Sequence, residues 1–508
     1  MDAIIPSGRP TVLELPADLQ PNVIEHLRKN LTYTDKRVEF ELQKAKKSFY
    51  LQQKLGEEGY REHIAKLQRD RTKCLLKEDQ QTGGLSTMAG LAGRVAHHGD
   101  LTIRNEVNYP DFVGCAWQST PKPPRPYQFQ ARDLLLQHRH AAVEMGTGLG
   151  KSWIMAMLAK EIGLQTVVMT PSRSIAWQMY DDFVKAFGKK WVGMYGDGKK
   201  EFKKRFTIAI AASLTKLSPE DEPYRFFSKA QVFMADESHT CPADTLVTVC
   251  EGICAKAPYR FFFSGTQTRG DGLEIVLEGI TGPIVFTMTV AEGVEQGYLS
   301  KPHFRMFDVP STEDFRSNDA NDMTRCHGFY NPRINQIAGG IANKAYAQLG
   351  HPVLILVDEM EQFTHLLPHL KHEVAFAHGG VTKDNARKIP AAFHKSDPGA
   401  LVEKFNAGDL PILVGTSCIA TGTDIRAVKT IVYLMFGKSE IQFKQAVGRG
   451  TRLKADGKNE FWFFDFKPVL NGDGPETDYR DLSIVNRHAI ARAQLAREIY
   501  PDFKETAL

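Results

Sequence analysis

The sequence predicts an α/β protein in which two parallel-sheet lobes in tandem follow a small α+β N-terminal domain. Short apolar runs alternate with helical patterns from about residue 127 onward, and such runs are typical of parallel strands buried on both faces. The alternation restarts after about residue 300, which indicates a second lobe. Prolines at 121, 123, 124 and 126 stiffen the chain ahead of the first lobe and predict a domain boundary there.

Size, composition and charge narrow the class of protein. The 508 residues, 42% hydrophobic and 24% charged, suit a globular chain with several domains. A net charge of +4 is only mildly basic, so affinity for DNA or RNA would have to come from local patches. No long apolar run and no signal-peptide pattern occur, so we expect a soluble, intracellular protein with no membrane partner.

Cysteine spacing superficially suggests zinc. Cys250 and Cys254 lie four residues apart, with His239 and Cys241 nearby. The stretch around the first two is apolar and helix-like, and the spacing is not CxxC. We therefore expect reduced, buried thiols.

Residues 1–118 carry no nucleotide motif and form the predicted N-terminal domain. Apolar patterns predict strands over 12–15, 38–42 and 101–107 and helices over 23–31 and 85–97, and a basic helical stretch runs from Lys44 to Lys73. The proline-rich residues 119–126 are expected to be a linker with few contacts, so that a chain starting near Pro121 would fold alone. Beyond it, strands are predicted over 141–144, 166–170, 207–211, 232–235 and 259–263, then 353–357, 374–377, 412–414, 431–434 and 461–464.

A glycine-rich turn lies between a predicted strand and a predicted helix of the first lobe, residues 127–298. The turn consists of Gly146, Thr147, Gly148, Leu149 and Gly150. Its backbone N–H groups and the following helix dipole would face a phosphate chain. Lys151 would neutralise the β- and γ-phosphates, and the Ser152 hydroxyl would coordinate Mg²⁺. Met145 stands where the strict phosphate-loop pattern has its first glycine.

Two carboxylates follow the buried strand over 232–235. Asp236 would hold Mg²⁺ through water, while Glu237 would orient or deprotonate the attacking water. His239 and the turn Ser264, Gly265, Thr266 after the next strand would sense the γ-phosphate and couple it to a nucleic-acid side.

The start of the first lobe offers groups for a base. The Tyr127 ring could stack on adenine, and the Gln128 amide could pair with its N6/N7 edge. Together with the phosphate loop, this pair favours ATP over GTP.

The second lobe, residues 299–480, contributes arginines. Gln445, Arg449 and Arg452 lie in one helical segment, and the two arginines are expected to share a face. Their guanidinium groups could stabilise charge on a transferred γ-phosphoryl group from across a cleft that closes on ATP. Residues 481–508 predict a basic C-terminal helix whose arginines, at 487, 492 and 497, form a solvated face.

Taken in order, these motifs resemble those of the superfamily-2 helicases and translocases over roughly residues 125–470. The resemblance rests on Gln128, the phosphate loop, Thr170-Pro171-Ser172, the Asp-Glu-Ser-His box, Ser264-Gly265-Thr266, Thr421-Gly422-Thr423-Asp424 and the arginine motif. It implies two RecA-like lobes that use ATP and Mg²⁺, with Gly422 and Asp424 at the nucleotide. It also implies nucleic-acid contacts at Thr170, Pro171, Ser172 and Thr416.

Within this superfamily the chain looks most like the XPB and type III restriction-motor branch, and in particular the phage UvsW-type helicases. Residues 74–79, 84–85 and 102–103 loosely resemble the end of that group's DNA-binding domain, and residues 264–272 and 297–299 are also similar. Gly265 departs from the alanine of many relatives, as Met145 departs from glycine, but neither change removes a catalytic group.

The resemblance implies an ATP-driven DNA helicase that migrates Holliday junctions and stalled forks in recombination, replication and repair. It would act on duplex and branched DNA in a host cytoplasm if phage-encoded, as a monomer, alongside replication or recombination proteins. A basic run could track a phosphate backbone or be a solvated loop; it comprises Lys199, Lys200, Lys203, Lys204 and Arg205.

Three alternatives stay open. One is an RNA helicase. Another is the motor of a restriction system, although Asp308 and the Asp358-Glu359 pair lack the ExK partner of a nuclease. The third is a non-catalytic DNA-binding scaffold, which would be expected to have lost Lys151, Glu237 or Arg449.

Overall fold

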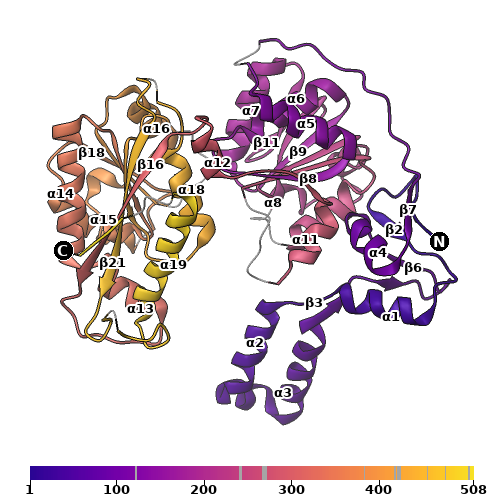
Figure 1. Cartoon of the computed structure of the whole chain (residues 1–508), viewed down its shortest axis with the longest axis horizontal. Coiled ribbons are helices and arrows are strands. Elements are labelled where there is room, and N and C mark those ends of the chain that lie inside the picture. Colours follow the sequence, from indigo (N-terminus) through magenta and orange to yellow (C-terminus); the bar gives the residue numbers. More distant parts are fainter. Residues whose placement is uncertain are drawn as a thin grey trace. The chain divides into compact units, whose positions relative to one another are not determined.

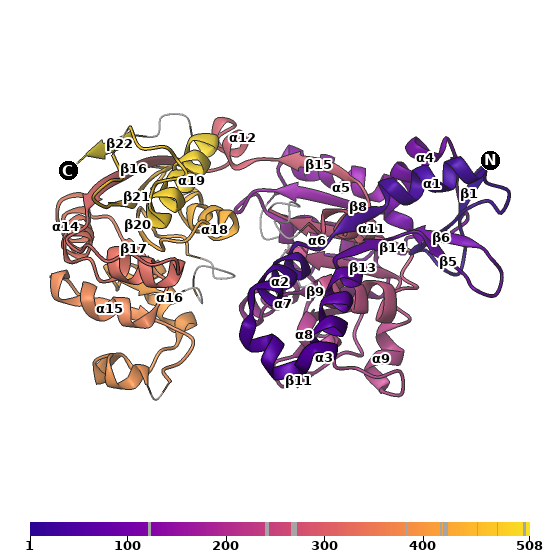
Figure 2. The same cartoon turned by 90° about the horizontal axis from the view of Figure 1, so that it is seen from below.

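The chain forms two compact units in the computed structural model (Figures 1 and 2). The structure describes residues 1–119, 123–238, 243–265, 272–382, 384–416, 419, 425–454, 456–474, 476–500 and 504–507. One unit comprises residues 1–145 and 150–287, and the other comprises residues 146–149 and 288–508. Within the described ranges, no helix is long and apolar enough to cross a bilayer.

The N-terminal domain of the first unit is a five-stranded sheet covered by short helices. Its strand order is β5-β6-β2-β1-β7, and β1 is antiparallel to β2 but parallel to β7. The strands are β1 (Asp2–Ile5), β2 (Val12–Glu14), β5 (Lys77–Glu78), β6 (Leu85–Met88) and β7 (Thr102–Asn105), and the helices are α1 (Pro21–Asn30), a 3-10 turn (Ala89–Leu91) and α4 (Ala92–Gly99). The helix expected from residue 85 thus begins as a strand.

A two-helix arm projects from this domain (Figure 1). The antiparallel strands β3 (Thr32–Thr34) and β4 (Thr72–Cys74) form its root, and α2 (Lys36–Lys47) and α3 (Phe49–Arg71) form its length. The strand predicted over 38–42 is wrong. Asp35 caps α2 by accepting from two backbone N–H groups, and the side chains at 38, 42 and 45 turn toward α3 at helical spacing.

The N-terminal domain is packed tightly onto the first lobe. A Cβ on Gly90, in the 3-10 turn, would lie 2.4 Å from the carbonyl oxygens of both Glu278 and Gly279. A Cβ on Gly279 would lie 2.7 Å from the Met88 sulfur, and Arg94 Nε donates to Glu278 Oε2 at 2.7 Å. Such close backbone approach is possible only because both positions are glycine.

Residues 106–119 also lie against the first lobe rather than forming a free tether. Backbone N–H groups at 113, 115 and 118 donate to carbonyls at 162, 160 and 186. The Trp117 ring stacks on Trp153 and Phe187, with centroids 5.1 and 5.2 Å away, and the Tyr259 hydroxyl donates to Pro110 O at 2.7 Å. The expectation that few contacts hold residues 1–118 to the lobe is therefore wrong, and a chain starting near Pro121 would lose a covering layer.

The arm's root touches the lobe near two functional loops. Gly272 has φ +80°, and a Cβ there would lie 2.4 Å from Thr34 O. Tyr33 packs against the core of the first lobe; burial raises its pKa, and the charges of Asp35 and Asp244 add to the rise. The root thus lies next to Gly272 and close to the helix α10 (Ala243–Val247), which comes after the acidic box formed by Asp236 and Glu237.

The first lobe is an eight-stranded sheet with helices on both faces. The strand order is β11-β10-β12-β9-β13-β14-β8-β15, and every strand pairing from β10 to β8 is parallel. The strands are β8 (His140–Met145), β9 (Thr166–Thr170), β10 (Val192–Gly196), β11 (Lys199–Lys200), β12 (Phe206–Ile210), β13 (Val232–Asp236), β14 (Tyr259–Ser264) and β15 (Ile284–Met288). Its helices include α5 (Pro126–His138), α6 (Lys151–Ile162), α7 (Arg173–Phe187), α8 (Ala211–Leu214), α9 (Glu222–Phe227), α10, a π-helical segment (Thr248–Ile253) and α11 (Glu274–Thr281). Cys250 and Cys254 are buried as expected, and burial raises the pKa of Cys254 to about 12.

The second unit is a seven-stranded parallel sheet. Its strand order is β18-β19-β17-β20-β21-β16-β22. The strands are β16 (Lys301–Pro310), β17 (Val353–Val357), β18 (Val374–Ala377), β19 (Ile412–Gly415), β20 (Thr430–Leu434), β21 (Glu460–Val469) and β22 (Lys504–Ala507). The principal helices are α12 (Val290–Glu295), α13 (Ala320–Thr324), α14 (Pro332–Leu349), α15 (Met360–Leu366), α16 (Pro398–Ala407), α18 (Glu440–Gly450) and α19 (Ile484–Ile499).

The C-terminal helix α19 is part of this fold, contrary to the prediction of a solvated basic face. Arg492 is fully buried, and its guanidinium donates to both carboxylate oxygens of Asp465 at 2.8 and 3.1 Å. It also donates to the carbonyls of Phe436, Gly437 and Phe466. This one side chain therefore ties α19 to the middle of β21 and to the segment that follows β20, whereas Arg497 is exposed.

Candidate nucleotide and nucleic-acid sites

Three neighbouring strands bring the predicted catalytic motifs together. β13 pairs with β14, and β14 pairs with β8, so Asp236 lies opposite Phe263 and Ser264 opposite Glu144. Because the strands are parallel, the phosphate loop, the acidic box and the Ser264 turn all leave the sheet at one edge, where ligands bind in open α/β folds.

Lys151 is the buried centre of this edge. Its Nζ lies 3.1 Å from Glu237 Oε1 and donates to Met145 O at 3.1 Å, while the residue is only 8% exposed. The ammonium follows a turn in which Gly148 and Gly150 have φ of +89° and +83°, conformations that favour glycine. The loop geometry predicted from the sequence is thus present although Met145 replaces the first glycine.

The acidic box is strained and charged. Glu237 has φ +47°, a left-handed conformation that is costly for a non-glycine residue and is found preferentially at functional sites. Asp236 is buried, and its carboxylate accepts from Glu237 N at 3.0 Å. Burial and the neighbouring Glu237 charge raise the pKa of Asp236 to about 7, although the Lys151 ammonium opposes the rise.

This donor set fits a divalent cation with a phosphate chain. Two adjacent carboxylates share one ammonium in a dry setting, so a cation would supply the missing positive charge, and carboxylate oxygens are ligands that Mg²⁺ prefers. Asp236 and the half-buried Ser152, at the start of α6, are placed to hold it. Lys151 and the loop N–H groups would hold the phosphates.

The turn after β14 lies over the Lys151 ammonium. Ser264 is buried at the strand end, and a Cβ on Gly265 would lie 3.9 Å from Lys151 Nζ and 3.8 Å from Met145 O. Those are ordinary contacts, so the alanine of many relatives would fit here. His239 and Thr266 lie outside the described residues.

The predicted adenine-binding pair is placed differently from expectation. Tyr127 is buried with its hydroxyl accepting from Arg125 Nη1 at 3.0 Å, so the expectation of a ring open to stacking is wrong. Gln128 Oε1 accepts from Arg125 N at 2.9 Å, which caps α5. A Cβ on Gly150 would lie 2.4 Å from Gln128 Nε2, so this amide supports the phosphate loop directly.

In the second unit, Arg449 and Arg452 do not share a helix face. Arg449 lies in the last turn of α18 and is 4% exposed, whereas α18 ends at Gly450 and Arg452 follows its C-cap. The prediction failed because the helix ends two residues before Arg452. Gln445 is half-buried on α18, and Thr416 is buried directly after β19. The predicted nucleotide residues Gly422 and Asp424 fall outside the described part of the chain.

The nucleic-acid candidates of the first lobe lie at the start of α7. Thr170 ends β9, and Ser172 caps α7 by accepting from Ile175 N at 3.5 Å; Pro171 lies between them. The helix begins with the exposed Arg173, whose Nε lies 2.8 Å from Asp197 Oδ1.

The basic run after residue 198 does not form one patch. Lys203 pairs with Glu222, Lys204 is half-buried, and the Arg205 guanidinium lies 4.8 Å from the Trp191 ring centroid. Lys199 and Lys200 are exposed on the edge strand β11.

Asp197, which none of the sequence motifs indicated, fixes the hairpin formed by β10 and β11. Asp197 accepts from Trp177 Nε1 at 2.9 Å in addition to Arg173, so it ties the β10–β11 turn to the first turns of α7. The Asp197-Gly198 pair is a hairpin-turn signal that could have revealed it.

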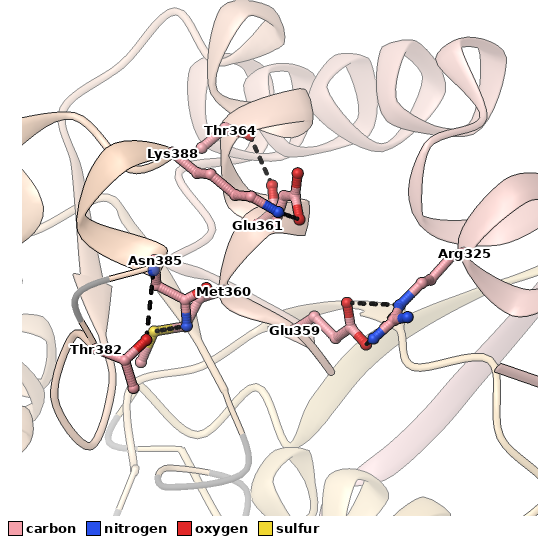
Figure 3. A network of polar contacts seen from close by, with 8 residues as sticks. All are labelled: Arg325, Glu359, Met360, Glu361, Thr364, Thr382, Asn385 and Lys388. Carbon is pink, nitrogen blue, oxygen red and sulfur yellow. Dashed lines mark hydrogen bonds and ion pairs between the residues drawn. The ribbon is translucent and has the colours of Figure 1, made fainter. Parts of the chain in front are cut away.

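Acidic residues at the carboxyl edge of the second sheet are engaged in ion pairs (Figure 3). Glu359, just after β17, receives Arg325 Nη2 at 2.7 Å, and Glu361 receives Lys388 Nζ at 2.7 Å. Asp308 pairs with Lys467 at 2.8 Å. Among the described residues, no group of three or more His, Cys, Asp and Glu side chains is placed to hold a metal ion.

Comparison with known families agrees with this geometry. The family model "Type III restriction enzyme, res subunit" matches residues 121–269, and "Helicase conserved C-terminal domain" matches residues 341–454. With the two parallel sheets and the phosphate-loop edge, these matches show that the chain belongs to the superfamily-2 helicases, the ATP-hydrolysing class with two RecA-like lobes, as the motif order predicted.

Individual relatives are distant. A probable helicase of Escherichia phage T5 is 25% identical over 311 residues, 60% of this chain and 63% of that protein. The DNA 3'-5' translocase XPB2 of Sulfurisphaera tokodaii is 20% identical over 65% of this chain and 79% of its own length. In fold, the DNA-bound restriction-modification enzyme LlaBIII matches 77% of this chain and 32% of its own with a TM-score of 0.54 and 14% identity. The chain thus spans less than two thirds of the phage relative.

Proposed function

We propose that this protein is an ATP-driven DNA translocase and helicase that remodels branched DNA such as Holliday junctions and stalled forks. The observation that carries the motor assignment is the buried contact of Lys151 with Glu237, 3.1 Å apart, beside Asp236 at the edge of the sheet. A structural ion pair would not need a second buried carboxylate or a left-handed glutamate.

Each residue at this edge of the sheet would have a different role in ATP hydrolysis. Magnesium ATP, when bound, supplies the γ-phosphoryl group with its charge partly neutralised by the metal. Lys151 would exchange Glu237 for the phosphates, which frees the Glu237 carboxylate to orient the attacking water. Arg449 and Arg452 would stabilise charge that develops on the γ-phosphate. Ser264, Gly265, Thr266 and His239 would report that charge to the nucleic-acid side.

Nucleic acid would be held on the first lobe by the start of α7 and its hairpin. Thr170, Pro171 and Ser172 lead into helix N–H groups that favour phosphate oxygens. Asp197 fixes the turn that carries Lys199 and Lys200 next to this helix. Thr416 would contribute from the second lobe.

The specificity for branched DNA is assigned to the N-terminal arm. Residues 36–71 contain ten Lys or Arg and six Asp or Glu, a formal charge of +4 that equals that of the whole 508-residue chain. A projecting element with this charge can reach a duplex arm that the motor lobes do not hold. DNA rather than RNA is the proposed substrate, and a monomer is the favoured working form.

The proposal is tested by the rate of ATP hydrolysis. This rate is measured without nucleic acid, with RNA, with linear duplex DNA and with a four-way DNA junction. The junction should stimulate most. RNA stimulation above that by every DNA would indicate an RNA helicase, equal stimulation by linear duplex would indicate a restriction-type motor, and no hydrolysis at all would indicate a scaffold.

Two substitutions make the assay specific to this site. Lys151→Ala should weaken triphosphate binding, whereas Glu237→Gln should still bind nucleotide and stall before chemistry. Normal turnover by Glu237→Gln, or its failure to bind ATP, would contradict the assigned roles.

A further inference from the structure

The far end of the arm exposes aromatic rings. Among the large hydrophobic side chains exposed in the described part of the chain, Tyr50, Phe49 and Phe40 rank highest, at 73%, 70% and 67%. Phe49 and Tyr50 open α3 immediately after Ser48, which caps it. Phe40 lies nearer the root, in the second turn of α2, so the far end presents the adjacent rings of Phe49 and Tyr50. Exposure of apolar rings is unfavourable by about 1.5–3 kcal/mol each relative to burial, so this pair of rings on a projecting end suits a ligand.

These rings are not left over from an incomplete core. The arm has its own small core, in which Leu42, Ala45 and Leu67 are buried with Val38, Leu51 and Ile64 packed around them. On α2, residues 40, 44 and 47 follow the same helical spacing on the side opposite residues 38, 42 and 45. The exposed stripe is thus a distinct surface of phenylalanine and lysine.

The chain on either side of Phe49 and Tyr50 carries positive charge, whereas Glu39 and Glu41 flank Phe40. From residue 42 to residue 56 the sequence contains Lys44, Lys46, Lys47 and Lys54 and no acidic residue. All four lysines are exposed. Flat aromatic rings interleaved with cations fit a nucleic-acid strand, in which bases stack on the rings and phosphates meet the ammonium groups.

A kink separates this end from the rest of α3. Gly56 has φ +70° and ψ 172° inside the helix, so the first turns, residues 49–55, run in a different direction from residues 57–71. No atom lies within 4 Å of a Cβ placed on Gly56. The kinked segment, here called the arm tip (residues 46–55), therefore presents its rings at the end of the arm.

We infer that the arm tip is a base-stacking site that binds unpaired nucleotides where a duplex opens. Phe49 and Tyr50 would stack on one or two exposed bases, and Lys46 and Lys47 would contact the flanking phosphates. This inference rests on the proposed nucleic-acid function, and it adds recognition of single-stranded bases to an arm that was assigned only to duplex binding.

The test uses the full-length protein and forked DNA with 2-aminopurine at the first unpaired position, compared with a blunt duplex at one stated salt concentration. The double variant Phe49→Ala/Tyr50→Ala should bind the fork about fivefold or more weakly per lost stack and should no longer quench the probe. Blunt-duplex affinity and ATPase without DNA should be unchanged. Tyr479→Ala, at a 53% exposed tyrosine in the second unit, serves as the matched control.

Salt dependence separates the rings from the lysines. Lys46→Ala/Lys47→Ala should flatten the log–log salt slope by about 0.7 per lost single-strand contact, whereas the aromatic variant should keep the wild-type slope. Unchanged fork affinity and quenching in the aromatic variant would overturn the inference and point to a protein-docking surface. If the wild-type protein binds no fork at all, it is the proposed function that fails.

Discussion

Replacement of Gly90 by alanine should loosen the N-terminal domain from the first lobe. The new Cβ would lie 2.4 Å from two backbone oxygens, whereas ordinary contacts begin at 3.4 Å, so the 3-10 turn and α11 must separate by roughly 1 Å. Backbone atoms cannot turn aside as a flexible side chain can. Overpacking of this kind destabilises by about 1–3 kcal/mol.

Gly93, one turn later in α4, provides the matched control. Nothing lies within 4 Å of a Cβ at this position, so Gly93→Ala should only favour the helix, by about 0.5–1 kcal/mol. The two substitutions have the same chemistry and opposite expected signs. Any general effect of adding a methyl group to this domain cancels in the comparison.

Hydrogen–deuterium exchange of peptides from α4 and α11 measures the effect locally, without assuming that a multidomain chain unfolds in one step. In Gly90→Ala these amides should exchange faster by about 5- to 150-fold, given that 1.4 kcal/mol corresponds to tenfold. In Gly93→Ala they should exchange no faster than in the wild type. Equal protection in the two variants would refute the close backbone contact.

Three further predictions concern the second unit. Arg449→Ala should leave nucleotide affinity nearly intact and slow single-turnover hydrolysis by on the order of 10³ or more, as loss of an arginine finger does, and full activity would place α18 away from the chemistry. Burial lowers the pKa of Lys454 from 10.5 to about 7, so the native state binds fewer protons than the unfolded state between these values, and stability should rise with pH across that window. Urea unfolding from pH 7 to 9.5 measures the free energy of unfolding across this window. Lys454→Met should flatten its rise with pH, whereas Lys458→Met, at an exposed position, should not. Arg492→Ala should lower the free energy of unfolding by about 3–5 kcal/mol because it leaves a buried carboxylate alone, and a similar loss in the exposed Arg497→Ala would contradict that cause.

Strands buried on both faces were the most predictable elements. The bounds of β9 and β17 match the prediction, and every residue of both strands is buried. The bounds of β18 match as well, although it is an edge strand with two half-buried residues. β16 was missed although it is ten residues long, because His303, Arg305 and Asp308 interrupt its apolar pattern. Its alternating burial depends on the strands that pair with it, and those strands lie far away in the sequence.

Helices of the arm and the C-terminus were misjudged for a related reason. Residues 38–42 satisfy a strand period and a helix period equally well over so short a window, and the cap at Asp35 decides in favour of helix. Arg492 looked solvated because its partner Asp465 lies 27 residues earlier. An ion pair of that separation exists only once the sheet has formed.

The catalytic edge was predictable because parallel strands all end at one edge of their sheet, so motifs that directly follow strands must lie there. The order β9-β13-β14-β8 in the sheet differs from the order of the motifs along the chain, and it brings the phosphate loop next to the Ser264 turn. The contact between Lys151 and Glu237 and the left-handed backbone of Glu237 were not predictable, since both depend on how loops leave neighbouring strands. Tyr127 was misplaced for the same reason: whether a ring stacks outward or packs inward is decided by tertiary neighbours.

The root of the arm is the point about which the arm would tilt, so a small rotation there displaces the far end. A Cβ on Gly272 would lie 2.4 Å from Thr34 O, and Tyr33 packs against the core of the first lobe near Asp244 of α10, so Gly272 and α10 both lie close to the short ribbon of β3 and β4. Helix α2, twelve residues long, extends about 18 Å from that ribbon. A tilt of roughly 6° at the root would carry the far end about 2 Å, at the 1.5 Å rise per residue of such a helix. A small shift of Gly272 or α10 that tilted the root would thus become a larger displacement of Phe49 and Tyr50, with the packing of Tyr33 as the pivot.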